Sequence, residues 1–450
     1  MVRHAFIVLT ILLIGFNSTL AQPGSRLLPG TSAGRRVTAY ITAFNSSDEN
    51  ALKKFFEEHL AKKALKDLPV EQRLPRARQL QSVAGTLSLH SVVRSTESLV
   101  NAILQGSKAG WLDFTFEFEP DEPHGLLFIK VQQVDNPDEP ALKPFPDEKS
   151  FVAATAAYLN EAAKKEEFSG VVLVAKGDSI MFLQSYGNAD RDKKIPNSIN
   201  TRFNVGSINK SFTRMAIYQL QDEGKLSLND SIGKYLPDYP NSIAASKVTI
   251  RQLLEMESGI GDFFGDRFEA AKKEGIRTLK DYLPFFADKP LEFEPGTGKR
   301  YSNGGYIVLG LIIEGATGMD YYSYVTQHIF KPAAMAGAGW FEKSNKNADI
   351  ARGYIGKEHS SNYSTLPQRG SSAGGGYCGA GDLMRYIVAI RKGILRLPGS
   401  EGGLGIAGGA PGLNVALEWM PERNYMVVVM SNFDPPAAET VARRIRRALP

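Results

Sequence analysis

Ser207 and Lys210 form a pair whose spacing suits covalent catalysis. They open a segment in which Ile208, Phe212 and Met215 recur at spacings of three and four, the pattern of one apolar helix face. Three residues span nearly one helical turn, so both side chains are expected on one face at the helix start. A serine becomes a nucleophile when a nearby amine takes its proton, and N–H groups at a helix start can stabilise an oxyanion.

The pattern S-x-x-K is weak evidence by itself. Ser207 could be only a helix N-cap, and Lys210 only a solvated charge. The pattern also recurs at Ser231 and Lys234, in a segment that runs into Pro237 and cannot hold a long helix. Other parts of the chain must therefore support the catalytic interpretation.

A second group that could move the proton is Tyr301, which forms a Y-x-N motif with Asn303. The motif follows a loop rich in proline and glycine, residues 294–300, and precedes an apolar run at residues 306–313. Tyr301 could act as a base or proton relay if a nearby lysine lowers its pKa. The Asn303 amide could hold a substrate carbonyl.

Rival motifs are weaker. Ser372 lies in a G-x-S-x-G sequence, but the fold that uses this motif needs a histidine after the serine, and the last histidine is His359. The two G-x-G-x-x-G sequences, at residues 374–379 and 403–408, open no β-α-β pattern and are interpreted as turns. The histidines show no metal-ligand spacing, and Cys378 is the single cysteine, so these residues predict no metal site.

Residues 1–21 have the composition of a secretory signal peptide. Arg3 and His4 precede an apolar core at residues 5–16 that is too short for a membrane span; a signal anchor is the alternative. We therefore expect an exported protein, periplasmic or secreted, with no membrane span after signal removal. The net charge of +5 is spread among acids, so the expected partner is a small molecule or peptide rather than nucleic acid. The oligomeric state is not indicated.

Residues 22–134 predict a small α+β domain. A flexible leader at residues 22–36 is expected to precede a helix that has Ser46 and Glu49 as a capping box. Four strand-like runs with alternating apolar residues follow, at residues 86–94, 98–104, 111–119 and 127–131. This antiparallel meander carries no motif for chemistry, and we interpret the domain as a packing or gating appendage. Residues 135–149 hold four prolines and predict a linker.

Residues 150–450 predict a second α+β domain built from its own two ends. It begins with a helix at 151–165 and a hairpin at 170–186, and it ends with a hairpin at 413–431 and a helix at 437–449. We expect these ends to form one antiparallel sheet flanked by helices. The helical middle would then be a second lobe, with a site between the lobes.

This second domain resembles the serine hydrolases of the class C β-lactamase type, which include DD-peptidases, β-lactamase-fold esterases and D-amino-acid peptidases. The stretches that carry the resemblance occur in the family's order, at residues 168–175, 203–210, 235–238, 248–254, 258–259, 294–303, 372–377, 381–383 and 408–412. The resemblance implies the fold described above, a serine hydrolase activity, and neither metal nor cofactor.

The resemblance also implies a set of site residues: Ser207, Lys210, Tyr301, Asn303, Gly408 and Gly409. Ser207 would be the acylated nucleophile and Lys210 its activating partner. Tyr301 would be the base and proton relay, and Asn303 a contact to a substrate amide. The oxyanion hole would combine the backbone N–H groups of Ser207 and Gly409.

The chain departs from the family pattern at the third motif. The family usually has His, Lys or Trp there, whereas this chain has Ile406, which cannot bind a carboxylate or assist proton transfer. The segment between residues 383 and 405 is also short and lacks a strand that usually precedes the motif, which could misplace Gly409. We therefore expect an esterase or peptidase rather than a true β-lactamase. The alternative is a catalytically degenerate member that binds cell-wall peptides or another ligand.

Overall fold

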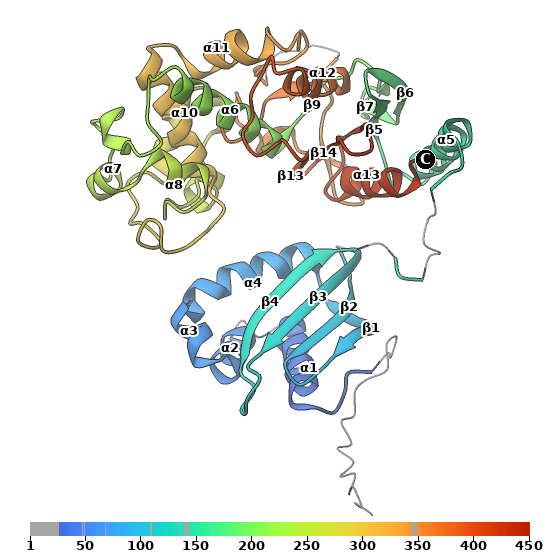
Figure 1. Cartoon of the computed structure of the whole chain (residues 1–450), viewed down its shortest axis with the longest axis vertical. Coiled ribbons are helices and arrows are strands. Elements are labelled where there is room, and N and C mark those ends of the chain that lie inside the picture. The colour runs from blue at the N-terminus through green and yellow to red at the C-terminus, as the bar shows by residue number, and fades with distance from the viewer. Residues whose placement is uncertain are drawn as a thin grey trace, which may run out of the picture. The chain divides into compact units, whose positions relative to one another are not determined.

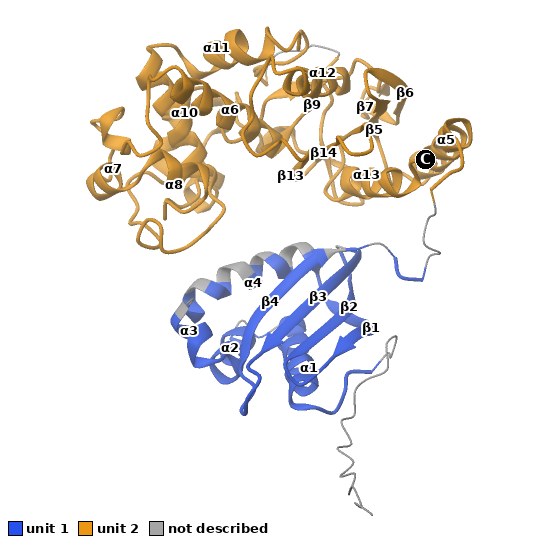
Figure 2. Ribbon diagram, in the orientation of Figure 1, with its two compact units in different colours: residues 1–141 blue, residues 142–450 orange. Residues whose placement is uncertain are grey.

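The structure is a computed structural model, and the chain divides into two compact units, residues 1–141 and 142–450 (Figure 1). Figure 2 colours the two units separately. The described residues are 27–46, 48, 50–67, 69–108, 110–134, 136–138, 144–343 and 349–450. The division falls inside the predicted linker, and the predicted signal peptide lies outside the described residues.

The first unit has the predicted antiparallel meander, but four helices precede it where one was predicted. Its helices are α1 (Ser32–Asn45), α2 (Ala51–His59), α3 (Lys62–Asp67) and α4 (Val70–Ala84). Its strands are β1 (Leu87–Ser95), β2 (Leu99–Gly106), β3 (Gly110–Phe118) and β4 (Leu126–Gln133), paired in chain order. The alternation in β3 places Phe114 and Phe116 in the core, where both rings lie against Tyr40 of α1.

Two local predictions for this unit are wrong. The flexible leader was expected to reach residue 36, but α1 begins at Ser32 with the Thr31 side chain accepting a hydrogen bond from the Gly34 N–H. Basic and polar residues lie next to the buried positions of this helix, such as Val37, so the sequence does not show its apolar face clearly. The capping box also does not form, because Ser46 ends α1 and the N-cap of α2 is Asn50.

The second unit has the predicted order of hairpin, helical middle and hairpin. Its first part contains α5 (Glu148–Lys164), β5 (Gly170–Lys176), β6 (Ser179–Tyr186), β7 (Asn188–Asp190), β8 (Ile195–Pro196) and β9 (Phe203–Asn204). Its middle contains η1 (Gly206–Ile208), α6 (Asn209–Asp222), η2 (Ile232–Lys234), α7 (Ser242–Lys247), α8 (Ile250–Leu254), α9 (Asp266–Ala270), η3 (Lys273–Gly275), η4 (Leu279–Phe285), α10 (Asn303–Thr317), α11 (Tyr321–Val325) and the π-helical turn η5 (Thr326–Phe330). Its last part contains β10 (Tyr354–Ile355), β11 (Ser360–Ser361), η6 (Tyr363–Thr365), β12 (Tyr377–Cys378), α12 (Ala380–Arg391), β13 (Leu404–Ala410), β14 (Leu413–Met420), β15 (Tyr425–Ser431) and α13 (Ala437–Ala448).

The two ends of the second unit meet in one antiparallel sheet with the order β13-β14-β15-β5-β6. Strands β15 and β5 pair over seven residues each, from Tyr425 opposite Lys176 to Ser431 opposite Gly170. Both strands are nearly continuous apolar runs because they are buried on both faces. Helices α5 and α13 contribute to the core on one face, and α6 and α12 to the core on the other. The predicted architecture is confirmed.

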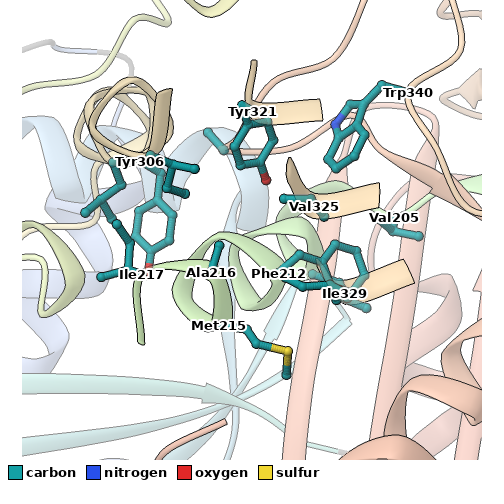
Figure 3. Close-up of a cluster of buried hydrophobic side chains, with 14 of the residues drawn as sticks. Val205, Phe212, Met215, Ala216, Ile217, Tyr306, Tyr321, Val325, Ile329 and Trp340 are labelled. Carbon is teal, nitrogen blue, oxygen red and sulfur yellow. The ribbon is translucent and has the colours of Figure 1, made fainter. Parts of the chain in front are cut away.

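Helix α6 is the buried support of the site. The predicted apolar face is confirmed, since Ile208, Phe212 and Met215 are all at most 1% exposed. The Phe212 ring packs edge-on against Phe330 and Tyr386, at centroid distances of 5.1 and 5.0 Å. Figure 3 shows part of this cluster around α6. Truncating one such ring typically costs about 3–5 kcal/mol, so the helix is firmly held.

Candidate active site

Ser207 lies where the edge of the sheet meets the helical lobe. Strand β9 leads into the turn Gly206–Ile208, and α6 continues from it. Gly206 has a φ of 50°, and a Cβ there would lie 3.1 Å from the Gly409 N of β13. The positive φ and this close approach both favour glycine before the serine. The turn therefore presents Ser207 beside the edge strand.

Strand β13 runs directly against the backbone of Ser207. A Cβ on Gly408 would lie 2.1 Å from the Val205 carbonyl oxygen and 2.9 Å from the Ser207 N, so there is no room for a side chain. The next residue, Gly409, is exposed. The predicted oxyanion donors, the N–H groups of Ser207 and Gly409, therefore belong to two backbone segments in close contact.

The short segment before the third motif leads into a fully paired strand. Helix α12 ends at Arg391, and residues 392–403 lead straight into β13. The strand then pairs with β14 along its whole length, from Leu404 opposite Trp419 to Ala410 opposite Leu413. The atypical Ile406 is half-buried and packs at the edge of the core.

The structure brings three predicted residues together. The Ser207 Oγ lies 2.6 Å from the Tyr301 hydroxyl and 3.3 Å from the Lys210 Nζ. Tyr301 comes from the loop before α10, whereas Ser207 comes from η1 and Lys210 from the start of α6. The ring of Tyr301 is 53% exposed, so its outer face is open to solvent.

Lys210 has the environment of a general base. It is 7% exposed, and burial lowers the pKa of its amine to about 7, although the charge of Asp262 acts in the opposite direction. The Nζ donates to the Asn303 Oδ1 at 2.7 Å and to the Ala373 carbonyl oxygen at 2.6 Å. A neutral amine has two N–H groups and one lone pair, and both partners can only accept. The lone pair is therefore left to face the Ser207 hydroxyl.

A role for Tyr301 as a base depended on a nearby lysine lowering the pKa of its phenol, and the pKa is instead raised. Burial of the hydroxyl raises the pKa of Tyr301, while its hydrogen bond with Ser207 lowers it to a smaller extent. The Lys210 Nζ lies over the ring, 4.8 Å from its centroid. The protonated phenol is thus favoured near neutral pH, and a role for Lys210 as the base stays a prediction. A role for Tyr301 as proton relay stays a prediction.

Asn303 is the first residue of α10, and its amide is largely used within the protein. Its Oδ1 accepts from Lys210, and its Nδ2 donates to the Asp262 Oδ2 at 2.8 Å. Only the second hydrogen on Nδ2 remains for a substrate carbonyl. The predicted substrate contact therefore stays a prediction, whereas a contact to Lys210 is found.

The carbonyl of Ala373 is a site group that the sequence analysis missed. It belongs to a buried segment that α6 holds: Asn209 Nδ2 donates to the Ser371 carbonyl at 3.1 Å, and Thr213 Oγ1 donates to the Ser372 carbonyl at 2.7 Å. Ser372 itself is fully buried and donates to the Tyr306 carbonyl, in agreement with its rejection as a nucleophile. A backbone carbonyl leaves no side-chain signal, although residues 372–377 contributed to the family resemblance.

Comparison with known proteins identifies the family. The family model described as Beta-lactamase matches residues 155–402, more than half of the chain. Penicillin-binding protein 4* of Bacillus subtilis (strain 168) is 35% identical over 205 residues, which is 44% of this chain and 45% of that protein. The putative penicillin-binding protein PbpX of the same organism is 28% identical over 291 residues, or 60% of this chain and 72% of that protein. The chain thus spans about half the length of the first of these relatives.

Solved structures agree with this result. A penicillin binding protein from Bacillus halodurans is 32% identical, with a TM-score of 0.58 over 64% of this chain and 99% of that chain. A D-amino acid amidase from Ochrobactrum anthropi has a TM-score of 0.55 at 21% identity, over 66% of this chain and 97% of that chain, and so shares the fold. The chain therefore belongs to the beta-lactamase family of serine hydrolases, as the sequence predicted.

The family model ends before the third motif and begins after the first unit. The first unit is thus an addition outside the matched residues. Within the residues that the structure describes, no helix is both long and apolar enough to cross a membrane.

Proposed function

We propose that this chain is an exported serine hydrolase that cleaves an ester, amide or small-peptide bond through an acyl-enzyme on Ser207. The observation that carries the proposal is the placement of Lys210: its Nζ lies 3.3 Å from the Ser207 Oγ while two fixed acceptors hold its N–H groups. An amine with a pKa of about 7 is close to the ideal for a base at neutral pH.

In the acylation step, Lys210 takes the proton of Ser207 as the Oγ bonds to the substrate carbonyl carbon. The N–H groups of Ser207 and Gly409 hold the oxyanion. As the bond to the leaving group breaks, Tyr301 gives its proton to the leaving atom, and the Lys210 ammonium returns a proton to Tyr301. Water then attacks the acyl carbon, its proton passes to Lys210, and Ser207 regains a proton as it leaves.

The edge strand supports an ester or peptide substrate rather than a β-lactam. Strand β13 carries no charged residue from Leu404 to Ala410, and Ile406 occupies the position where a cation would bind a substrate carboxylate. Neutral acyl groups therefore fit this site better than acids. The names of related proteins include penicillin-binding proteins, a D-amino acid amidase and EstCE1, a hydrolase with promiscuous acyltransferase activity.

Intact mass after incubation with a fluorophosphonate probe tests the activity. We expect one adduct on the wild-type chain, no adduct on Ser207→Ala, and a normal adduct on the matched control Ser231→Ala. A folded wild-type chain that stays unlabelled would overturn the proposal. It would favour the alternative, a degenerate member that binds its ligand without turnover, to which Ile406 points.

Export is tested separately by expressing the full chain with its first 21 residues. Recovery outside the cytoplasm of a protein that begins at Gln22 would support export. Retention of the uncleaved chain in the cytoplasm would contradict it.

A further inference from the structure

The carboxylate of Asp262 lies behind the site and is held by three N–H donors. Its Oδ1 accepts from the Phe264 backbone N–H at 3.1 Å, which fixes the carboxylate within its own loop. Its Oδ2 accepts from the backbone N–H of Asn303 at 3.1 Å and from the Asn303 Nδ2 at 2.8 Å. Asp262 does not contact Ser207 or Lys210 directly in any hydrogen bond of the described residues.

This arrangement decides which way the Asn303 amide points. An ionised carboxylate can only accept hydrogen bonds, so the NH₂ end of the amide must face Asp262. The oxygen end must then face Lys210, where it accepts at 2.7 Å. A flipped amide would place two N–H donors against Lys210, and the lysine would lose one of the two acceptors that aim its lone pair.

The loop that carries Asp262 is anchored to the start of α10. The Ser302 Oγ donates to the Gly261 carbonyl at 2.9 Å and accepts from the Gly305 N–H at 2.8 Å. A Cβ on Gly304 would lie 2.3 Å from the same Gly261 carbonyl, so the two segments are in close contact. The negative charge of Asp262 also sits at the positive end of the α10 dipole. The position of the Asp262 carboxylate is therefore fixed relative to the start of α10.

We propose that Asp262 is a positioning residue, which keeps Lys210 aimed at Ser207 by fixing the orientation of the Asn303 amide. The inference rests on the proposed function, because it assigns a role within that same site. Asp262 is then the second residue behind the base, and the order of contacts is Asp262, Asn303, Lys210 and Ser207.

The charge of Asp262 gives this role a second consequence. The titratable groups that face Lys210 are the rings of Tyr301 and Tyr306, with Asp262 acting at longer range and Arg214 acting on Tyr306. Asp262 raises the pKa of Lys210 against the larger lowering by burial. Removing the negative charge should therefore lower the pKa of Lys210 further.

The test compares the pH dependence of fluorophosphonate labelling in the full-length chain. For Asp262→Asn we expect the maximal labelling rate to fall about 10-fold to 100-fold, the cost of misplacing a reacting group. We also expect the acid limb of the profile to move to lower pH. Asp266→Asn is the matched control, since it removes the same charge from an exposed position four residues along and should change neither quantity.

A double-mutant cycle separates positioning from general loss of structure. If Asp262 acts through Asn303, the rate loss of Asp262→Asn should nearly vanish in an Asn303→Ala background. Asp262→Glu keeps the charge but moves the carboxylate, so its rate should fall while its acid limb stays near that of the wild type. Should Asp262→Asn not fold, as judged by its thermal melting, Asp262→Glu still tests the positioning role.

The outcomes distinguish this inference from the proposed function. An unlabelled wild-type chain would contradict the proposed function itself. A labelled wild-type chain, with an Asp262→Asn variant of unchanged rate and unchanged acid limb, would overturn the positioning role alone. Fully additive rate losses in the double-mutant cycle of Asp262 and Asn303 would also overturn the positioning role alone.

Discussion

The chain contains two S-x-x-K sequences in different surroundings. At the first, Lys210 is buried and its nearest partners are Asn303 Oδ1 and a backbone carbonyl, both neutral. At the second, the side chain of Lys234 is 56% exposed and forms an ion pair with Asp230 at 2.9 Å. Spacing and residue types are identical, so the surroundings alone separate the two lysines.

The surroundings move the two pKa values in opposite directions. Burial lowers the pKa of Lys210 to about 7, whereas the hydrogen bond that Lys234 donates to Asp230 raises the pKa of Lys234. Lys210 can therefore take a proton near neutral pH, while Lys234 stays an ammonium group. The comparison teaches that the motif locates a candidate, and that desolvation beside neutral acceptors lowers the pKa of its lysine towards neutral pH.

Removing the first lysine is the strongest way to sharpen the comparison. We expect Lys210→Ala to reduce the rate of fluorophosphonate labelling by about 10²–10⁴-fold, the usual contribution of a general base. Stopped-time labelling followed by intact mass measures the rate, and circular dichroism confirms that the variant is folded. Labelling within threefold of the wild-type rate would show that another group activates Ser207.

A methyl group on the edge strand tests the proposed oxyanion site at Ser207. We expect Gly408→Ala to lower the labelling rate by about 10²–10³-fold, since its Cβ would force β13 away from the Ser207 N. Gly405→Ala, on the same strand, is the matched control because no described atom lies within 4 Å of the added Cβ. Equal rates for the two variants would argue against an oxyanion role for β13.

The pH profile tests the lowered pKa directly. Because the neutral amine is the active form, the labelling rate should fall about tenfold for each pH unit below 7 and level off above it. The same lowering has a consequence for stability. The unfolded chain keeps its Lys210 protonated up to about pH 10, so the free energy of unfolding should rise with pH between about 7 and 10. A labelling rate independent of pH from 6 to 8 would contradict the assignment of Lys210 as the base.

The fold was largely predictable because its signals are local. The alternating runs of β3 and the apolar spacing that includes Phe212 each lie within a short window of sequence. The start of α1 was missed because polar neighbours surround its buried positions, such as Val37.

The candidate site was predictable only in part. Ser207, Lys210 and Tyr301 were singled out from local patterns, and the family resemblance then joined these distant motifs and implied their roles. Asp262 was missed because its role depends on a contact with a residue 41 positions away, and the Ala373 carbonyl because it has no side-chain signature. The raised pKa of Tyr301 was also beyond the sequence, since burial is a property of the folded chain.

The smallest expected effect belongs to the second motif. We expect Lys234→Ala to leave the labelling rate unchanged and to shift the melting temperature by no more than about 2 °C, because exposed ion pairs contribute little to stability. Asp230 keeps other partners, as it accepts from the Ser227 N–H at 2.7 Å and from the Tyr235 hydroxyl at 2.7 Å. The loop should therefore survive the loss of the lysine. A drop in labelling comparable to that of Lys210→Ala would mean that spacing, rather than burial, gives these lysines their chemistry.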